Sequence, residues 1–180
     1  MTDLEDLYRE IILDHYRSPR NRGELESPPA HRVEAFNPLC GDEIILTLLV
    51  DGDRVADIKF AGSGCSISQS SASLMSSAVK GKTLTEVRGL IRTFKSMMSI
   101  HEASLEPGSS GGQEDGAPNG SHNGHDDAAG RSPEPTDEVV DVRQLGELAA
   151  LQGVVKFPVR IKCATLGWNA LAQALDEVGT

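Results

Sequence analysis

The chain has 180 residues, of which 38% are hydrophobic and 24% charged, and its formal net charge at pH 7 is −10. This length is typical of one domain with its own core, so we expect a single domain over residues 1–180. The acidic charge argues against nucleic-acid binding, which needs a basic surface for phosphate. No apolar run approaches the roughly 18 residues of a membrane span, and no signal peptide is recognisable. We therefore expect a cytoplasmic protein that does not associate with membranes.

Most of the negative charge lies in one segment, residues 102–138. This segment has nine acidic residues and one base, together with seven glycines, four prolines and no aromatic residue. Such a composition buries too little apolar surface to offset the entropy lost on ordering. We predict a long disordered insertion over residues 102–138, so that two sequence blocks, 1–101 and 139–180, must meet in space.

The first block predicts a helix followed by a small sheet. Thr2 and Glu5 have capping-box spacing, apolar residues follow at helical spacing, and Ser18-Pro19 should end the helix. Residues 18–31 are expected to be a loop. Alternating apolar residues and the turn signal at 51–53 then predict three strands, over residues 33–36, 43–50 and 54–60.

After the strands the apolar period becomes helical. A first helix follows Cys65, and the eight serines of the segment from Ser63 to Ser77 suggest either close packing against a neighbour or a polar face. Thr83 and Glu86 form a second capping box before another amphipathic helix. Beyond the insertion we expect a short helix over residues 142–151 and a last helix starting near Pro158. This order predicts an α+β fold with a small antiparallel β-sheet packed against helices.

Two patterns that suggest chemistry are weak. Gly81-Lys82-Thr83 is similar to the end of a phosphate-binding loop, but Ser76 stands where that loop needs glycine, and the preceding segment is predicted to be helical. The histidines His15, His31 and His101 have no partner at the spacing of a ligand pair. We expect them to have surface or capping roles.

The three cysteines are the stronger candidates. An odd number argues against a disulfide framework and points to thiol or metal chemistry. Cys40 precedes a predicted strand, whereas Cys65 and Cys163 lie near predicted helix starts, where free N–H groups favour a thiolate. With Asp42 as an oxygen donor, three thiolates satisfy tetrahedral zinc or the two irons of a small cluster. Because no Cys-x-x-Cys pair is present, the spacing alone equally allows three buried free thiols.

Four separated motifs surround these residues. They are LYREIILDHYRSPRN at 7–21, NPLCGD at 37–42, GSGCSISQSSAS at 62–73 and RIKCATL at 160–166. In this order the motifs resemble the scaffold-type family of iron–sulfur cluster assembly proteins, which includes IscU, the N-terminal domain of NifU, and SufU. The resemblance covers nearly all of both blocks and fails only in the insertion.

The resemblance implies an α+β fold with a metal site at one exposed end. It assigns the metal-ligand role to Cys40, Asp42, Cys65 and Cys163. The chain is most similar to SufU-type members, because Lys162 stands where IscU-type members have histidine, and SufU-type members also carry extra residues between the second and third cysteines. Residues 156–160, KFPVR, replace the Leu-Pro-Pro-Val-Lys chaperone motif of IscU-type proteins, which argues against chaperone-assisted cluster release.

The similarity to SufU-type proteins implies bound Zn²⁺ and a sulfurtransferase function. A PLP-dependent, SufS-type cysteine desulfurase would dock, one of its histidines would replace Cys40 on zinc, and Cys40 would accept the persulfide sulfur. Asp42, Cys65 and Cys163 would keep the metal, and downstream iron–sulfur scaffold proteins would receive the sulfur. The similarity to IscU-type proteins implies an alternative, a non-enzymatic scaffold that assembles a [2Fe–2S] cluster on the same ligands and hands it to apo-proteins.

Overall fold

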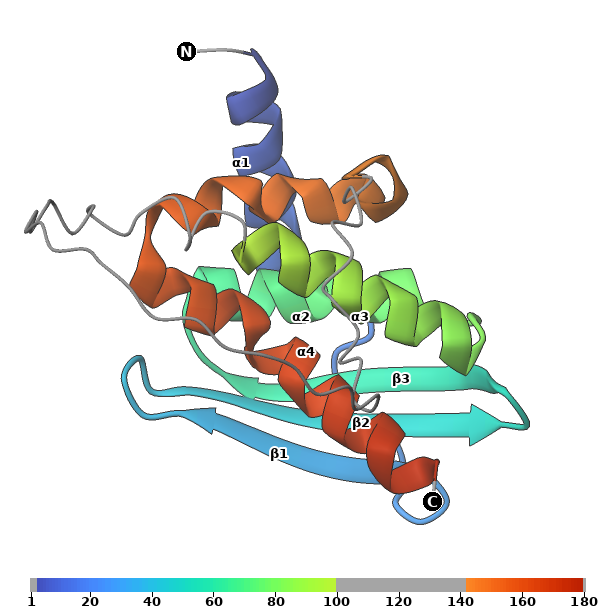
Figure 1. Cartoon of the computed structure of the whole chain (residues 1–180). Helices are drawn as coiled ribbons and strands as arrows, with labels where there is room; N and C mark the ends of the chain where they lie inside the picture. The colour runs from blue at the N-terminus through green and yellow to red at the C-terminus, as the bar shows by residue number, and fades with distance from the viewer. Residues whose placement is uncertain (1–2, 100–141, 180) are drawn as a thin grey trace, which may run out of the picture.

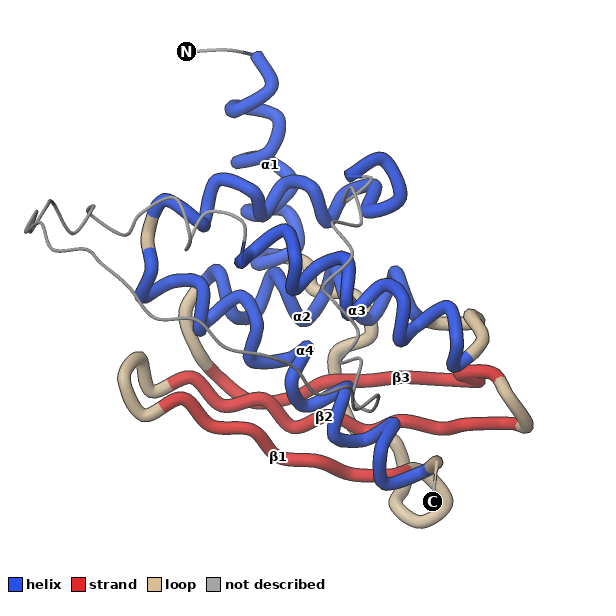
Figure 2. Tube along the Cα trace, viewed as in Figure 1, coloured by secondary structure: helices blue, strands red, loops and turns tan. Residues whose placement is uncertain are grey.

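The computed structural model describes residues 3–99 and 142–179, and its helices lie on one face of a three-stranded antiparallel sheet (Figure 1). Figure 2 shows the same arrangement by element type. The elements are α1 (Asp3–Arg17), β1 (His31–Asn37), β2 (Asp42–Asp51), β3 (Arg54–Ser63), α2 (Ser66–Val79), α3 (Leu84–Ser99), the 3₁₀-helix η1 (Val142–Lys156) and α4 (Pro158–Val178). The predicted α+β class is confirmed. The predicted insertion at 102–138 lies outside the described residues, as does Thr2 of the first capping box.

The sheet has the order β1-β2-β3, with β2 in the centre. Alternate residues of β2 enter the core beneath the helices, and Leu46 pairs with Val33 of β1 and Phe60 of β3. β3 extends beyond the predicted residue 60 as far as Ser63. The backbones of β2 and β3 stay paired there because Gly62 has φ +111° and no side chain, whereas a Cβ would lie 2.2 Å from the Glu43 carbonyl oxygen. This extension brings the end of β3 beside the start of β2.

The serine-rich helix α2 packs between α1 and α4, as the close-packing interpretation predicted. The Ser71 hydroxyl donates to the Ala164 carbonyl oxygen at 2.6 Å and accepts from Trp168 Nε1 at 3.2 Å. Trp168 is fully buried and stacks on Phe94 with 4.3 Å between the ring centroids. These contacts fix α4 against α2 and α3.

His15 does not have the surface or capping role that we expected. Its side chain is 3% exposed, and Nδ1 lies 2.8 Å from the Ser73 hydroxyl while Nε2 lies 3.3 Å from the Glu147 carboxylate. Burial is the main cause that lowers the pKa of His15. The expectation was wrong because both partners come from distant parts of the sequence. His101 lies outside the described residues.

The helix boundaries follow the sequence signals closely, with one exception. The capping box of α3 is confirmed, because the Thr83 N–H donates to the Glu86 carboxylate at 2.8 Å and the Glu86 N–H donates to the Thr83 hydroxyl at 3.2 Å. The short helix predicted over 142–151 is instead a 3₁₀-helix that continues to Lys156 and breaks at Gly146, where φ is 54°. Within the described residues, no helix is both long and apolar enough to span a membrane.

We predict that Ser71→Ala lowers the free energy of unfolding by about 1–3 kcal/mol, because it leaves the buried Trp168 N–H and Ala164 carbonyl without their shared partner. Urea unfolding followed by the fluorescence of Trp168, the single tryptophan, measures the change. Ser77→Ala, at an exposed position of the same helix, is the matched control and should leave the midpoint unchanged. Equal midpoints for all three proteins would contradict the assigned role of Ser71.

Candidate metal centre

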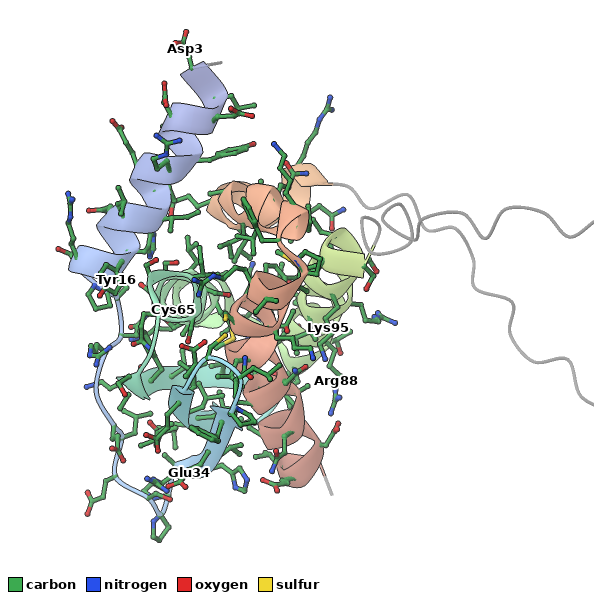
Figure 3. The ribbon with its side chains drawn as sticks, turned by 90° about the vertical axis from the view of Figure 1, so that its left-hand side faces the viewer. Asp3, Tyr16, Glu34, Cys65, Arg88 and Lys95 are labelled. Carbon is green, nitrogen blue, oxygen red and sulfur yellow. The ribbon has the colours of Figure 1, made fainter. Side chains whose placement is uncertain are left out.

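Three segments that are far apart in the sequence meet at one end of the molecule. The β1–β2 turn carries Cys40, the β3–α2 connection carries Cys65, and the first half of α4 carries Cys163. Figure 3 looks onto this end, with Cys65 labelled at the start of α2. The sulfurs of Cys40 and Cys163 and a carboxylate oxygen of Asp42 all lie within 4.8 Å of one another. The fold therefore brings together these three predicted site residues.

The turn that carries Cys40 is held by Asn37. The Asn37 side-chain oxygen accepts from the Leu39 N–H at 3.1 Å, and its carbonyl oxygen accepts from the Gly41 N–H at 2.9 Å. Gly41 has φ +68°, a conformation that glycine adopts without strain. The turn leaves Cys40 half-buried, so its sulfur is the accessible member of the close Cys40–Cys163 pair.

Asp42 is the fully buried first residue of β2 and connects the sheet to α2. Its Oδ1 accepts from the Cys65 N–H at 2.8 Å, and its Oδ2 lies 3.6 Å from the Cys65 sulfur, which donates to it. Gly64 makes this approach possible, because a Cβ there would lie 2.6 Å from Asp42 Oδ1. The glycine before Cys65 thus lets the chain come close to the carboxylate.

Cys65 is the N-cap residue of α2, which confirms its predicted position near a helix start. Its sulfur accepts from the Ser68 N–H at 3.4 Å. The N-cap position thus places the Cys65 sulfur beside the backbone N–H groups of the first turn of α2, which lack partners within the helix. Cys65 stands outside the group of three whose ligand atoms all lie within 4.8 Å, and it joins that group through Asp42.

Cys163 does not lie at a helix boundary. It is the sixth residue of α4 and is fully buried, beyond the first turn where backbone N–H groups lack helical partners. The helix-start argument therefore does not apply to this thiol. Burial is the largest cause that raises the pKa of Cys163, followed by hydrogen bonds with Cys40 and Asp42.

Arg160 is a site residue to which the sequence reasoning gave no role. It lies one turn before Cys163 on α4, and a side-chain hydrogen bond with Cys163 is the main cause that raises the Arg160 pKa. Electrostatic interactions with Cys65 and Cys163 also raise the Arg160 pKa. The guanidinium therefore supplies positive charge beside a set of sulfurs. The sequence shows that Arg160 belongs to the RIKC motif, but its contact with Cys163 forms only when this segment is helical.

An apolar groove of about 610 Å³ opens beside Cys40. It is lined by Leu39, Cys40, Lys156, Phe157, Pro158, Val159 and Arg160. Leu39, Phe157 and Val159 are 68%, 61% and 59% exposed, an unusual position for large apolar side chains. The sequence analysis did not predict this apolar rim, which consists of Leu39, Phe157 and Val159. The available signal was apolar residues beside Cys40 and beside Pro158, the first residue of α4.

The donors at this end suit a zinc ion. Three sulfurs and one carboxylate oxygen form a set that binds Zn²⁺ tetrahedrally, and cysteine sulfurs also hold iron–sulfur clusters. The absence of a Cβ at Gly64 leaves space for Asp42 Oδ1, and an Asp42 oxygen lies within 4.8 Å of the sulfurs of Cys40 and Cys163. Of these residues, Cys163 and Asp42 are buried, whereas Cys40 and Cys65 are half-buried.

Known proteins are similar to this chain in sequence. Residues 7–107 match the model of the NifU-like N terminal domain. The chain is 40% identical over 175 residues to the zinc-dependent sulfurtransferase SufU of Bacillus subtilis (strain 168), covering 97% of this chain and 93% of that protein. It is 37% identical over 177 residues to the iron–sulfur cluster assembly scaffold protein IscU of Streptococcus pyogenes serotype M1, covering 98% and 87%.

A solved structure is also similar to this chain in fold and sequence. A SufU from Fervidobacterium islandicum AW-1, crystallised as a candidate iron–sulfur cluster assembly scaffold for the SUF system, matches with a TM-score of 0.67 and 29% identity. The match covers 92% of this chain and 94% of that one. The resemblance predicted from the four motifs is confirmed, and the chain belongs to the family of NifU-like N-terminal domains, the iron–sulfur cluster assembly proteins that include SufU and IscU.

Proposed function

We propose that this protein is a zinc-dependent sulfurtransferase, which accepts persulfide sulfur from a PLP-dependent, SufS-type cysteine desulfurase for iron–sulfur cluster assembly. The observation that carries the proposal is the half-buried sulfur of Cys40, which lies within 4.8 Å of the donor atoms of the buried residues Asp42 and Cys163. The 40% identity to a protein named zinc-dependent sulfurtransferase SufU supports the same assignment.

Cys40, Asp42, Cys65 and Cys163 would hold the zinc ion. Zinc, when bound, keeps cysteine sulfurs in the thiolate form at neutral pH. The residues of the chain supply the rest: Asp42 fixes Cys65 through two contacts, and Arg160 offsets part of the negative charge of the sulfurs. Asp42, Cys65 and Cys163 keep the site assembled while Cys40 reacts.

The transfer itself needs one exposed thiolate. The Cys40 sulfur attacks the terminal sulfur of a cysteine persulfide on the desulfurase, and the bond between that sulfur and the desulfurase cysteine breaks. The electron pair of the broken bond remains on the desulfurase thiolate, and Cys40 becomes the persulfide. Downstream iron–sulfur scaffold proteins then receive this sulfur.

The rim around Cys40 provides the surface for such a partner. Leu39, Phe157 and Val159 are exposed apolar side chains next to the reactive sulfur, and Lys156 and Arg160 add positive charge. Burial of apolar side chains drives most protein association, so a partner that covers this rim brings its persulfide to Cys40. The same contact shields the reacting sulfurs from water.

The second candidate is a scaffold that builds a [2Fe–2S] cluster on the same four residues and passes it to apo-proteins. It is favoured by the donor chemistry, because cysteine sulfurs hold iron as well as zinc. The 37% identity to a protein named as an IscU scaffold points the same way. Metal and sulfide content separates the two candidates.

We predict that protein purified without oxygen contains about one zinc per chain and no acid-labile sulfide. Added to a SufS-type desulfurase, it should raise the rate of alanine formation from cysteine, and Cys40→Ala should lose this stimulation because it lacks the accepting sulfur. Trp168 fluorescence should show that the variant is folded. Iron with labile sulfide, and no stimulation of the desulfurase, would contradict the sulfurtransferase and favour the scaffold.

A second prediction concerns the carboxylate. Gly64→Ala should weaken zinc retention about 10–100-fold in competition with a chelator, because the new Cβ displaces a ligand from its position. Asp42→Ala should weaken retention at least as much. Gly89→Ala is the matched control, since a Cβ there meets nothing within 4 Å. Retention unchanged in both site variants would remove Asp42 from the ligand set.

A further inference from the structure

Cys40 and Cys163 form an unusually close pair of free thiols. The Cys163 sulfur donates to the Cys40 sulfur across 3.1 Å, and the structure joins none of the three cysteines in a disulfide. A disulfide bond is about 2.05 Å long, so the two sulfurs need to approach by only about 1 Å to bond. A pair this close offers chemistry beyond metal binding.

We infer that Cys163 is a resolving thiol, which in the metal-free chain attacks the Cys40 sulfur whenever Cys40 carries a sulfur adduct, closing a Cys40–Cys163 disulfide. For a persulfide the inference rests on the proposed function. The new bond joins the Cys163 sulfur to the inner sulfur on Cys40, and the bond to the outer sulfur breaks. The outer sulfur leaves with the electron pair and the Cys163 proton as hydrogen sulfide. The Cys163 sulfur is oxidised from the thiol to the disulfide level, the outer sulfur is reduced to sulfide, and the inner sulfur on Cys40 keeps its oxidation level, so no external oxidant is needed.

The geometry selects Cys163 over Cys65 as the attacking thiol. The Cys65 sulfur donates to Asp42 at 3.6 Å and accepts from the Ser68 N–H at 3.4 Å, which holds it at the start of α2. The 3.1 Å contact of the Cys40 sulfur is with Cys163, and Cys65 is not in the group that includes both. Attack by Cys65 would require it to leave both of its partners.

The leaving group has a path out of the site. Cys40 lines the groove of about 610 Å³, so an outer sulfur or a larger adduct on Cys40 can lie in that groove. Lys156 and Arg160 line the same groove, and their positive charges stabilise a departing thiolate. The accessible side of Cys40 thus takes the adduct, whereas its enclosed side faces Cys163.

A metal held by the four site residues would engage the Cys163 sulfur and withhold it from this reaction. Metal occupancy would then decide the fate of sulfur on Cys40: the metal-loaded chain keeps it for transfer, and the metal-free chain loses it as sulfide. The burial of Cys163 slows attack by this thiol, but a reaction partner already in contact gains the large rate advantage of an intramolecular step.

An aryl disulfide tests the thiol pair without any sulfur donor protein. The full chain, freed of metal with a chelator, receives one equivalent of 5,5′-dithiobis(2-nitrobenzoate), which places a thionitrobenzoate on Cys40 and releases a first thionitrobenzoate. Attack by Cys163 should release the second, at a rate that Cys163→Ser lowers at least about tenfold. Cys65→Ser is the matched control and should keep the second release. Peptide mapping of the parent chain should find the Cys40–Cys163 disulfide, and added zinc should suppress it.

Two results would overturn the inference. The first is a second release of thionitrobenzoate that is as fast in Cys163→Ser as in the parent chain. The other is a Cys40–Cys65 disulfide in the parent chain, which peptide mapping detects without any variant. Inorganic polysulfide, used to load Cys40 with a persulfide, should give sulfide release that depends on Cys163 in the same way. A chain that passes these tests but takes no sulfur from a desulfurase would contradict the proposed function alone.

Discussion

The contact between the Asp42 carboxylate and the backbone of Cys65 is the interaction on which this end of the molecule depends. A buried carboxylate costs free energy unless hydrogen bonds or a metal compensate for it, and Asp42 is fully buried. The Cys65 N–H, 2.8 Å from Oδ1, is a partner that only the bare backbone of Gly64 allows to come so close. The contact therefore joins the first residue of β2 to the residue that caps α2, and it sets where the cysteines around it can lie.

The site combines a fixed part with an accessible part. Cys163 is carried by α4, whose position is set by the buried contacts of Ser71 and Trp168. Cys40 lies in a turn between two strands, half-buried and beside an exposed apolar rim. This division suits a protein that must hold a metal while it offers one sulfur to a partner. It also places a second thiol, Cys163, 3.1 Å from the Cys40 sulfur.

The sequence predicted the elements well where the signal was local. The strong apolar periods and the Thr83 capping box are properties of neighbouring residues, and they gave the strands and helices to within a few positions. One failure came from long-range contacts, because His15 is buried by partners far along the chain. Another is local: η1 is a 3₁₀-helix with a break at Gly146. At the site, the spacing of the cysteines left their role open, and the family motifs supplied the ligand set. The sequence analysis missed Arg160 because its contact with Cys163 forms only when the segment that carries both residues folds into α4.

In the proposed function, three cysteines and one aspartate hold one zinc ion as a single centre. X-ray absorption at the zinc edge of the full chain, purified without oxygen, tests it most directly because the method counts the atoms bound to the metal. We expect three sulfurs at about 2.3 Å and one oxygen at about 2.0–2.2 Å around each zinc. Zinc bound to two or fewer sulfurs, or a site filled by iron with iron–iron scattering, would contradict it.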